Sequence, residues 1–414
     1  MPTNTLVTNS DLAEHLLAHF INQCQFARLA NRYYQDEYRS VNGFMRGNTI
    51  RILRPTYFVP RQGPSLSPSA ISERETFLTL QYQDGQDIEL SSVQMTTDID
   101  DLSVRVLRPI AIGLANLVDV RIATEVALKC YNKIGTGSAQ LNSFASFNSW
   151  EQQLFSRGVI GDYEAILNAT DSTALQNSLQ NAFNTTLNEE ISIYGRLGEL
   201  ANVSVYKSQN VQPHTNGTWT GSPAVDGANQ SGSTLLCKAF GAAATINRGD
   251  VFYISNGTAV NAINPVPTPS GVGNRSIGTT ADALQRFIVT EAAVASGGGA
   301  VTLTIDPPIV LTGPYQNVTN APDDSALLTV VGGAATLFRN NFMFTKEAIS
   351  CAIVPLIVPP GAVNASVMTD PETGISMRVI DSYDAQNDVA IKRVDLLYGI
   401  QIFGEYLAGF AAGT

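Results

Sequence analysis

The sequence predicts an α+β fold in which a body of helices and strands is interrupted by an all-β segment. Apolar residues at helical spacing dominate residues 109–134. Short β-type runs separated by turn residues recur from 210 to 335, and mixed patterns then resume up to the C-terminus. At about 100–200 residues per domain, a chain of 414 residues suffices for two or three domains.

The composition restricts the classes of function. Apolar residues make up 44% of the chain and charged residues only 15%, which predicts a charge-poor surface that partner subunits can cover. An apolar-rich soluble enzyme would have the same composition. The net charge of −11 argues against a protein that neutralises nucleic-acid phosphates. An ordinary acidic soluble protein has the same balance of charge.

The cysteines and the first residues bear on the compartment. Each of the four cysteines lies more than a hundred residues from the next, so neither a zinc site nor a disulfide framework is indicated. They are Cys24, Cys130, Cys237 and Cys351. Buried, reduced thiols suit assembly in a cytoplasm. The start of the chain lacks the pattern of a signal peptide, and no apolar run of about 18 residues predicts a membrane span.

Residues 1–42 are predicted to be mainly helical. A helix is expected over residues 10–38, where Ser10 or Asp11 can cap its first turn. Apolar side chains repeat four positions apart, at Leu12, Leu16 and Phe20. A helix with this pattern can pack on its own domain.

Residues 43–97 are predicted to form an extended β-hairpin loop. Thr49–Arg54 alternates as a strand, and a Pro/Gly/Ser stretch follows at residues 60–69. A second strand pair is expected on both sides of Asp84-Gly85, a dipeptide typical of hairpin turns. An isolated ribbon is marginal in water, so this loop should lean on another surface. Its arginines are candidate contacts with an acidic neighbour, or solvated charges: Arg46, Arg51, Arg54 and Arg61.

Residues 109–134 are predicted to form one long helix. Pro109 suits its first turn and Gly135 suits the position after its last. At 1.5 Å per residue, about 25 residues give a rod of about 38 Å. Apolar side chains surround its first turns, at Ile110, Leu114, Leu117, Val118 and Ile122. A charged stripe at i+4 spacing provides candidate contacts with another subunit or with water: Arg121, Glu125 and Lys129.

Residues 141–200 are predicted to contain two or three helices, followed by a strand at Val203 and Val205. Residues 210–335 then form a compositional island rich in Gly, Thr, Ala, Asn and Pro. Short strands are expected there at Leu235–Ala239, Asp250–Ile254, Gln285–Val289 and Val301–Ile305. About 125 residues suffice for an independent barrel or sandwich core. A carbohydrate-binding module is the alternative, for which Trp219 and Tyr253 would be the exposed aromatic residues.

The sequence offers no constellation of catalytic, cofactor-binding or metal-binding residues. His15 and His19 share a helix face, but no third metal ligand follows, so a polar face explains them. The glycine-rich residues 271–278 lack the Lys-Ser/Thr pair of a phosphate loop, and no G-x-S-x-G motif occurs. Three aspartates lack calcium-loop spacing and are expected to cap a turn: Asp381, Asp384 and Asp388.

Two β-type runs, Ile375–Ile380 and Val389–Ile402, flank these turn residues and predict a hairpin. In the second run, charged and apolar side chains alternate, as on a strand with one wet face. The charged members are the candidate contacts Arg393 and Asp395.

Two stretches, Phe338–Gly361 and Arg378–Phe403, resemble the coat-protein family of tailed double-stranded-DNA bacteriophages. The first contains FRNNFMFTKEA, similar to an aromatic-flanked helix start of the family, and VPLIVP, similar to one of its strands. The second contains RVDLLYG, similar to a late strand. The resemblance is to the short-tailed phage branch, whose coat has the Hong Kong 97-type fold with an inserted β domain.

The resemblance implies a division of the chain into arm, loop and domains. An N-terminal arm (1–42) would lie on neighbouring subunits, and an extended loop (43–97) would reach over the adjacent subunit. A peripheral domain (98–140 and 375–400) would contain a spine helix at 109–134. An axial domain would combine residues 141–209, 336–374 and 401–414, and the inserted β domain would be residues 210–335.

The resemblance also implies a function. A major capsid protein of this family assembles into hexamers and pentamers of an icosahedral shell that encloses double-stranded DNA. Assembly around a scaffolding protein, a portal at one vertex and expansion on DNA packaging are implied, without a cofactor or a membrane. A decoration protein is a further candidate partner, and the packaged DNA is expected to make no sequence-specific contact. An encapsulin-like nanocompartment is the alternative, followed by a soluble β-rich glycan-binding protein or enzyme.

Overall fold

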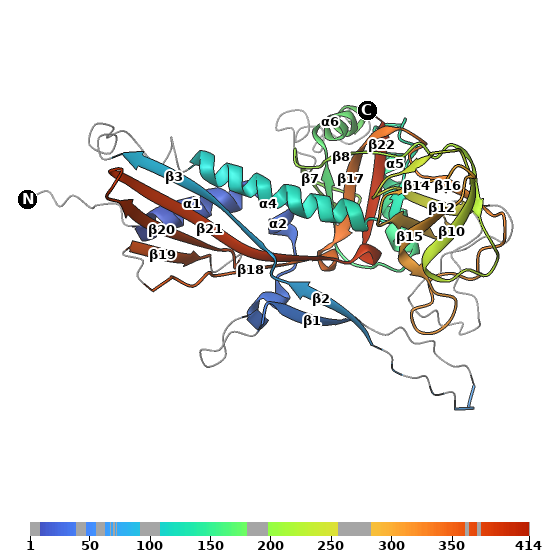
Figure 1. Cartoon of the computed structure of the whole chain (residues 1–414), viewed down its shortest axis with the longest axis horizontal. Coiled ribbons are helices and arrows are strands. Elements are labelled where there is room, and N and C mark those ends of the chain that lie inside the picture. The colour runs from blue at the N-terminus through green and yellow to red at the C-terminus, as the bar shows by residue number, and fades with distance from the viewer. Residues whose placement is uncertain are drawn as a thin grey trace, which may run out of the picture. The chain divides into compact units, whose positions relative to one another are not determined.

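A computed structural model describes most of the chain, namely residues 9–38, 47–54, 63–66, 68, 71, 73–91, 108–179, 198–255, 283–360, 364–370 and 374–413. Contacts divide the chain into two compact units, which are described separately. Unit one comprises residues 1–52, 76–122 and 349–401, and unit two comprises residues 53–75, 123–348 and 402–414. Helices and strands occur in both (Figure 1), so the predicted α+β class is confirmed.

A sheet forms the centre of unit one, in the order β18-β21-β20-β19 with β3 also paired to β21. Its strands are β18 (Ile349–Val354), β21 (Val389–Ile402), β20 (Ser376–Asp384), β19 (Asn364–Thr369) and β3 (Tyr82–Ser91). β20 and β21 are the predicted hairpin. In its turn Asp384 Oδ1 accepts a hydrogen bond from Gln386 N at 2.9 Å, and Asp388 takes a φ of 54°. The expected VPLIVP strand ends at Val354, because Pro355 has no N–H for the ladder.

The turn predicted at Asp84-Gly85 is wrong. Both residues lie inside β3, which runs unbroken along β21 with Gly85 opposite Asp395. A Cβ atom at Gly85 would lie 2.4 Å from the carbonyl oxygen of Val394. This glycine therefore permits a close approach of two strands and does not mark a turn.

The single helix predicted over residues 10–38 is broken into three pieces. These are α1 (Asn9–Gln23), α2 (Phe26–Leu29) and a 3₁₀ helix, η1 (Tyr33–Tyr38). The fully buried carboxylate of Asp119 accepts hydrogen bonds from Gln25 N at 2.7 Å and Ala27 N at 3.1 Å. Backbone donors at the start of α2 are thus satisfied from outside, which stabilises the break. Phe20 is fully buried, and α1 packs on β19 and β20.

The predicted long helix is present as α4 (Arg108–Lys129), but it ends five residues before Ile134. Asn132–Ile134 instead forms the strand β4, which pairs in parallel with β22 (Leu407–Gly413). This long-range pairing overrides the helical pattern. The prediction that buried apolar side chains surround the first turns of this helix is also only partly correct, because Leu117 is 40% exposed.

Strands β1 (Thr49–Arg54) and β2 (Arg74–Thr79) form a two-stranded ribbon. β1 confirms a predicted strand, and half of the Pro/Gly/Ser stretch at residues 60–69 lies outside the described residues. Ile52 and Leu78 are buried, and the hydroxyl of Tyr38 donates to the carbonyl oxygen of Leu78 at 2.5 Å. The part of the ribbon in unit one therefore leans on its own chain.

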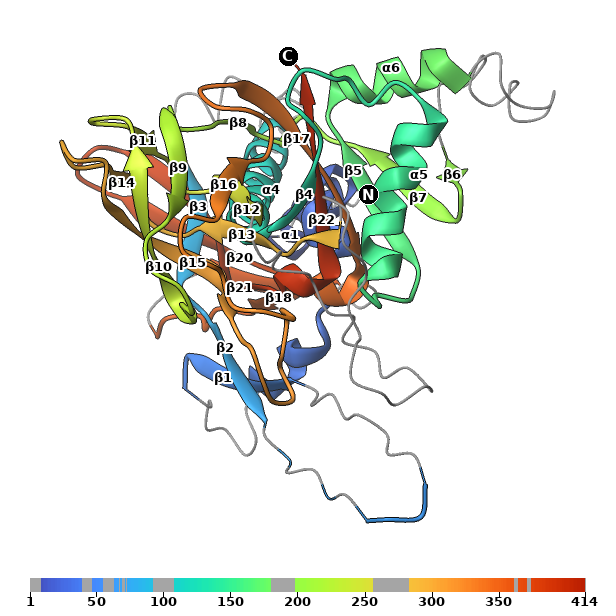
Figure 2. The ribbon, with the colours of Figure 1, turned by 90° about the vertical axis from the view of Figure 1, so that its right-hand side faces the viewer.

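A mixed seven-stranded sheet lies in unit two, in the order β4-β22-β17-β5-β7-β6 with β8 also paired to β17. Its further strands are β17 (Leu337–Thr345), β5 (Tyr163–Leu167), β7 (Val203–Lys207), β6 (Glu199–Leu200) and β8 (Pro213–Thr215). The helices α5 (Phe144–Ser156) and α6 (Ala169–Leu179) lie beside it (Figure 2). Trp150 and Leu154 of α5 are fully buried in the core of this sheet.

The helix start expected at Phe338 is wrong. This residue lies in β17, which pairs with β22 on one side and with β5 on the other. Phe338, Phe342 and Phe344 are almost fully buried, and their even spacing fits the two-residue period of a strand. The only helical turn that follows directly is the 3₁₀ helix η5 (Lys346–Ala348). A second short 3₁₀ helix, η6 (Gly404–Tyr406), precedes β22.

Six strands close into a barrel between residues 221 and 330, in the order β10-β15-β13-β12-β16-β9. They are β9 (Gly221–Val225), β10 (Gly232–Phe240), β12 (Val251–Ser255), β13 (Arg286–Val289), β15 (Val301–Ile309) and β16 (Leu327–Val330). All four strands predicted here are confirmed, in β10, β12, β13 and β15. The Pro307-Pro308 pair lies within β15. β11 (Thr245–Ile246) and β14 (Ala293–Val294) form a separate small pair.

Candidate assembly contacts and the neck of the barrel

Seven of the nine residues predicted to contact other subunits lie in the described part of the chain, while Arg46 and Arg61 lie outside it. Arg51 is exposed on β1. The other six lie at the base of the ribbon (Arg54), in the C-terminal half of α4 (Arg121, Glu125 and Lys129), and on β21 (Arg393 and Asp395). Their roles between subunits stay predictions.

At the base of the ribbon, Arg54 binds within its own chain. Its Nη2 atom lies 3.0 Å from Glu405 Oε1, and its guanidinium stacks 5.0 Å from the centroid of the Phe403 ring. Burial raises the pKa of Glu405, and the positive charge of Arg54 acts in the opposite direction. Arg54 is therefore engaged by a partly desolvated carboxyl and not by water alone.

Tyr315 connects the two strands of the ribbon at the same base. Its hydroxyl accepts a hydrogen bond from Arg74 N at 2.8 Å and donates to the carbonyl oxygen of Arg54 at 3.4 Å. The guanidinium of Arg74 also lies 5.7 Å from the Tyr315 ring centroid. Both ends of the segment between β1 and β2 are thus held by one tyrosine that follows β15.

A small pocket of about 120 Å³ opens beside this base, lined by Arg74, Arg157, Gln285, Tyr315 and Glu405 among others. At about 30 Å³ per water molecule, it holds roughly four waters. Its lining contains no Ser, Cys or His, and its one carboxyl group is that of Glu405.

Arg121 on α4 belongs to a buried network inside unit one. Its Nη2 atom lies 2.9 Å from Asp84 Oδ1, and its guanidinium lies 4.8 Å from the Tyr82 ring centroid. The other oxygen of Asp84 accepts a hydrogen bond from the hydroxyl of Tyr398 at 2.5 Å. The side chain of Asp84 is only 9% exposed. The first charge of the predicted stripe thus holds β3 and β21 to α4.

The other two members of the stripe are less constrained. Lys129 Nζ lies 2.8 Å from Asp306 Oδ2, but these side chains are 40% and 31% exposed. Glu125 is half-buried. Exposed pairs of this kind contribute only about 0–1 kcal/mol, so these two residues fit a surface that can exchange partners.

On β21, the expectation of one wet face is correct for Arg393 and wrong for Asp395. The Arg393 side chain is 51% exposed, whereas Asp395 is 2% exposed. Asp395 accepts hydrogen bonds from Arg393 Nε at 2.8 Å and from Arg378 Nη2 at 2.5 Å. Bonding to Asp395 raises the pKa of Arg393. Sequence alternation alone does not reveal that a second arginine from β20 would allow a carboxylate to be buried here.

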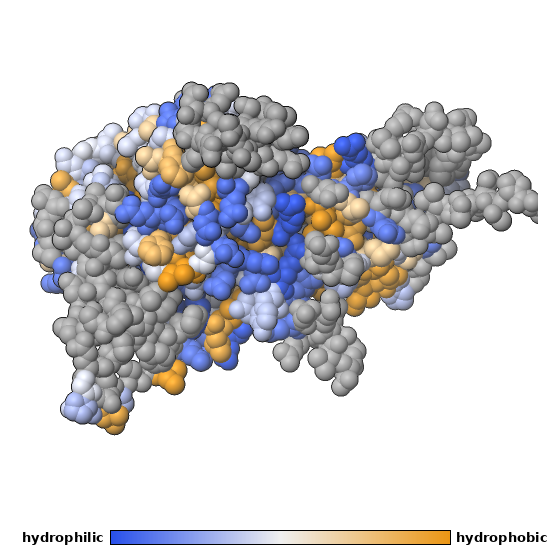
Figure 3. Space-filling model, turned by 180° about the vertical axis from the view of Figure 1, so that it is seen from behind, coloured by the Kyte–Doolittle hydropathy of each residue, from blue (hydrophilic) through white to orange (hydrophobic). Residues whose placement is uncertain are grey.

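Exposed apolar side chains occur at several separate places. On the face shown in Figure 3, apolar and polar residues are interspersed. The largest exposed fractions include 84% at Leu66, 74% at Ile71, 73% at Ile160, 63% at Val294 and 60% at Phe155. Small scattered patches suit many modest contacts better than a single obligate interface.

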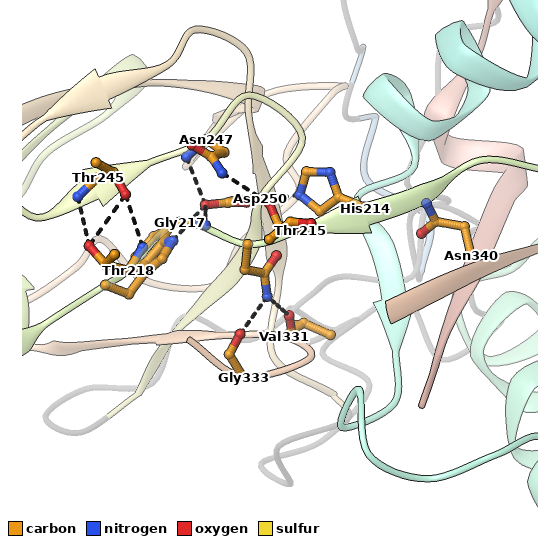
Figure 4. Close-up of polar contacts among 12 residues, drawn as sticks. His214, Thr215, Gly217, Thr218, Thr245, Asn247, Asp250, Val331, Gly333 and Asn340 are labelled. Carbon is orange, nitrogen blue, oxygen red and sulfur yellow. Dashed lines mark hydrogen bonds and ion pairs between the residues drawn. The ribbon is translucent and has the colours of Figure 1, made fainter. Parts of the chain in front are cut away.

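The chain segment that includes His214–Gly217 connects to the barrel and belongs to a region that we call the neck (Figure 4). His214 on β8 pairs with Phe338 on β17, so the chain entering the barrel lies beside the chain leaving it. Asn216 Nδ2 donates to the carbonyl oxygens of Val331 at 2.8 Å and Gly333 at 2.7 Å. The neck consists of residues 213–219 and 331–339.

Asp250, which precedes β12 directly, is fully buried behind the neck. Its Oδ2 atom accepts hydrogen bonds from Gly217 N at 3.0 Å, Asn247 N at 2.9 Å and the indole Nε1 of Trp219 at 2.7 Å. Its Oδ1 atom lies 2.9 Å from His214 Nε2. Four partners satisfy the acceptor capacity of one carboxylate. From the sequence, Asp250 was predicted only to be the first residue of a strand. Its position directly before an apolar run was the one feature of the sequence that could have indicated a buried carboxylate.

Trp219 is not the exposed aromatic residue of a glycan-binding surface. It is 5% exposed, and its ring lies 5.6 Å from those of both Phe240 and Phe252 in the barrel core. Its φ of 39° is unusual for a large residue. The indole bond to Asp250 and the burial of the ring offset that backbone strain.

Metal and thiol chemistry find no support in the described residues. Among them, no three His, Cys, Asp or Glu side chains gather as around a metal ion. No helix within the described ranges has the length and apolar character to cross a membrane. All four cysteines are buried and unpaired, as expected. Burial raises the pKa of Cys130, Cys237 and Cys351 to about 12.

Comparison with known proteins gives one family match. The model of the family described as P22 coat protein, gene protein 5, matches residues 81–411. No curated protein is significantly similar to the chain.

Several solved structures are also similar in shape. A chain of Mycobacterium phage Che8 is 14% identical, with 94% of this chain and 91% of that chain covered and a TM-score of 0.47. The capsid structure of cyanophage P-SCSP1u is 10% identical, with 94% of this chain and 88% of that chain covered and a TM-score of 0.44. A virus-like particle from Pyrococcus furiosus is 8% identical, with 97% of this chain and 98% of that chain covered and a TM-score of 0.38.

Proposed function

The chain belongs to the P22 coat protein family, and from this premise we propose that it builds its shell from hexamers and pentamers. Membership makes it a major capsid protein, a structural protein of the virion that forms the icosahedral capsid of a bacteriophage. It also carries the Hong Kong 97-type fold that the two C-terminal stretches indicated. The match over residues 81–411 is the observation that carries the proposal.

We infer the partners and the assembly route from the same membership. The shell assembles in the cytoplasm of the bacterial host around a scaffolding protein, with a portal at one vertex, and expands when DNA enters. A decoration protein can bind the outside. The net charge of −11 supports an inner surface that does not grip DNA, and the four buried, unpaired thiols support a reducing compartment.

The extended loop is proposed to act between subunits. Its base is held in its own chain by Arg54, Arg74 and Tyr315. Its outer part exposes apolar side chains such as Leu66 and Ile71. A segment with a fixed base and an apolar outer part is suited to lie on a neighbour, because water is a poor environment for its apolar side chains.

Expression of the chain with and without its scaffolding protein, followed by electron microscopy, tests the shell. Closed icosahedral particles are expected, and persistent monomers or open sheets under all conditions would contradict the proposal. DNA packaging by these shells in infected cells separates a capsid from an encapsulin-like compartment, which would enclose a protein cargo instead.

Deletion of Arg61–Ser69 tests the loop. A folded, soluble monomer that fails to form stable shells is expected, because the base contacts at Arg54 and Tyr315 remain. A Gly/Ser segment of the same length is the matched control, since it keeps the reach and removes the side chains. Normal, heat-stable shells from the deletion would show that the loop has no role between subunits.

A further inference from the structure

Within unit two, the barrel is held to the rest of the unit by the partly exposed pair of Lys129 with Asp306 of β15, and at two more buried places. Beyond α5, the guanidinium of Arg157 donates to the carbonyl oxygen of Leu284 at 3.2 Å and to Gln285 Oε1 at 3.4 Å. Arg286 Nη1 donates to Gln153 Oε1 at 3.3 Å. The contacts at the second place, the neck, are shorter and involve the buried carboxylate of Asp250.

The donors around Asp250 come from different parts of the unit. His214 lies on β8 of the seven-stranded sheet, Gly217 and Trp219 follow β8 in the neck, and Asn247 lies between β11 and the barrel strand β12. A rotation of the barrel about its neck would pull some of these donors away. It would leave a carboxylate that is buried and incompletely bonded, which is strongly unfavourable.

The barrel itself has other sources of stability. Its six strands close on one another, and its core includes Phe252, Phe287, Leu235 and Leu303, all fully buried. Asp250 lies outside β12 and adds no apolar surface to this core. The barrel should therefore stay folded when the carboxylate is removed.

We propose that Asp250 is a positioning residue that clamps the barrel to the seven-stranded sheet at one fixed orientation. The clamp makes each copy present its barrel to its neighbours at the same angle. Only this second statement rests on the proposed function, because the clamp itself is a property of the isolated chain.

Hydrogen exchange on the unassembled full-length chain tests the clamp with Asp250→Asn and His214→Phe. Asparagine has one acceptor oxygen, so it cannot serve all four donors. Phenylalanine keeps the aromatic contact with Phe338, now 5.5 Å between ring centroids, but cannot donate. The amides of Gly217 and Asn247 should exchange at least about tenfold faster in Asp250→Asn, as expected for loss of a charge-assisted hydrogen bond. His214→Phe should increase the exchange rates of these amides less than Asp250→Asn does.

Amides of β10 and β15 are the internal reference and should change by less than about twofold, since the barrel core is intact. Asp324→Asn is the matched control. Asp324 is an exposed barrel carboxylate that accepts from Gly227 N at 2.8 Å and Lys238 Nζ at 2.5 Å, and its loss should leave the neck unchanged.

Unchanged exchange at the neck in both variants would overturn the proposal. So would equal loss of protection in β10 and β15, because Asp250 would then be needed for folding and not for position. His214→Phe keeps the test valid if Asp250→Asn does not fold, because His214 lies on β8 and outside the barrel.

In shells, electron microscopy should show barrel density weaker than that of the sheet in the variants. Equally sharp density would overturn the role in assembly, and absence of shells from the wild-type chain would contradict the proposed function alone.

Discussion

Buried carboxylates connect segments of this chain that lie far apart in sequence. Asp119 binds backbone donors at the start of α2, and Asp250 binds four donors around the neck. Asp171 is fully buried and accepts from Arg339 Nη2 at 3.2 Å and Asn341 Nδ2 at 3.0 Å. A buried charge is costly unless it is fully bonded, so each such residue fixes the position of its partners.

We predict that Arg121→Ala destabilises the unassembled chain by about 1–3 kcal/mol, a range reduced for the partial exposure of the arginine. The substitution removes the ion pair of Asp84 and the contact with the Tyr82 ring, and leaves a largely buried carboxylate bonded only to Tyr398 among these residues. Thermal and denaturant unfolding of the monomer measure the effect. The sequence alone predicts that this change spares the monomer, because it does not show Asp84 opposite α4.

Glu125→Ala is the matched control on the same stripe, and it should change the free energy of unfolding by less than about 0.5 kcal/mol. Arg121→Lys should fall between the two, since lysine keeps the charge but cannot stack flat on an aromatic ring. Equal stability of Arg121→Ala and the wild-type chain would show that the network contributes nothing.

A second prediction at this scale concerns pH. Burial raises the pKa of Glu405 above its unfolded value, so between the two pKa values the folded chain binds more protons than the unfolded chain. The contribution of Glu405 to stability is therefore present at acid pH and is lost as pH rises through the folded pKa. Glu405→Gln removes this titration. The stability advantage of the wild-type chain over the variant should shrink as pH rises, as measured by denaturant unfolding at several pH values between about 4 and 8. An advantage that grows with pH would contradict the raised pKa.

At the scale of elements, local patterns predicted strands better than they predicted where helices end. β1, β7, β20, β21 and four barrel strands follow from alternation and turn residues. The ends of α1 and α4 depend on distant partners, namely Asp119 and the pairing of Asn132–Ile134 with β22. Asp84-Gly85 has the composition of a turn, but ladder pairing with β21 holds it straight. Such partners leave no local signal.

The difference between buried and exposed apolar positions on α4 can be tested by substitution. Leu114 is 3% exposed and Val118 is fully buried, whereas Leu117 is 40% exposed on the same helix. An aspartate at either buried position places an unpaired carboxylate among apolar groups, costing several kcal/mol against a typical stability of about 5–15 kcal/mol. Leu114→Asp and Val118→Asp should therefore yield no folded monomer by circular dichroism and gel filtration.

Leu117→Asp is the matched control and should yield a folded monomer, because its side chain already meets solvent. If it folds but its shells form poorly, this part of α4 contacts another copy. Folding of the two buried variants would mean that α4 is packed less tightly than described.

At the scale of the whole chain, the sequence predicted the α+β class, a barrel or sandwich at residues 210–335 and the family, but not how the barrel is attached. Composition marks the barrel because its short strands and turns are local. The clamp at Asp250 combines residues 214, 217, 219 and 247, which only the folded chain brings together. Candidate contacts predicted from charge alone were similarly incomplete, since Arg54, Arg121 and Asp395 bind partners within the chain.

The last prediction is that residues 210–335 fold alone. A closed barrel leaves no long strand edge exposed, and its core is contributed by residues within this range. The fragment also contains all four partners of Asp250, and three of them, Gly217, Trp219 and Asn247, lie outside the pairing of β8 with β17. A β-type circular dichroism spectrum and one cooperative thermal transition are expected.

A shorter fragment, 221–330, is the matched control. It removes Trp219 from the core and leaves Asp250 with one donor of the four, and should melt at a clearly lower temperature. A random-coil spectrum from the longer fragment would mean that the barrel depends on the seven-stranded sheet for its stability.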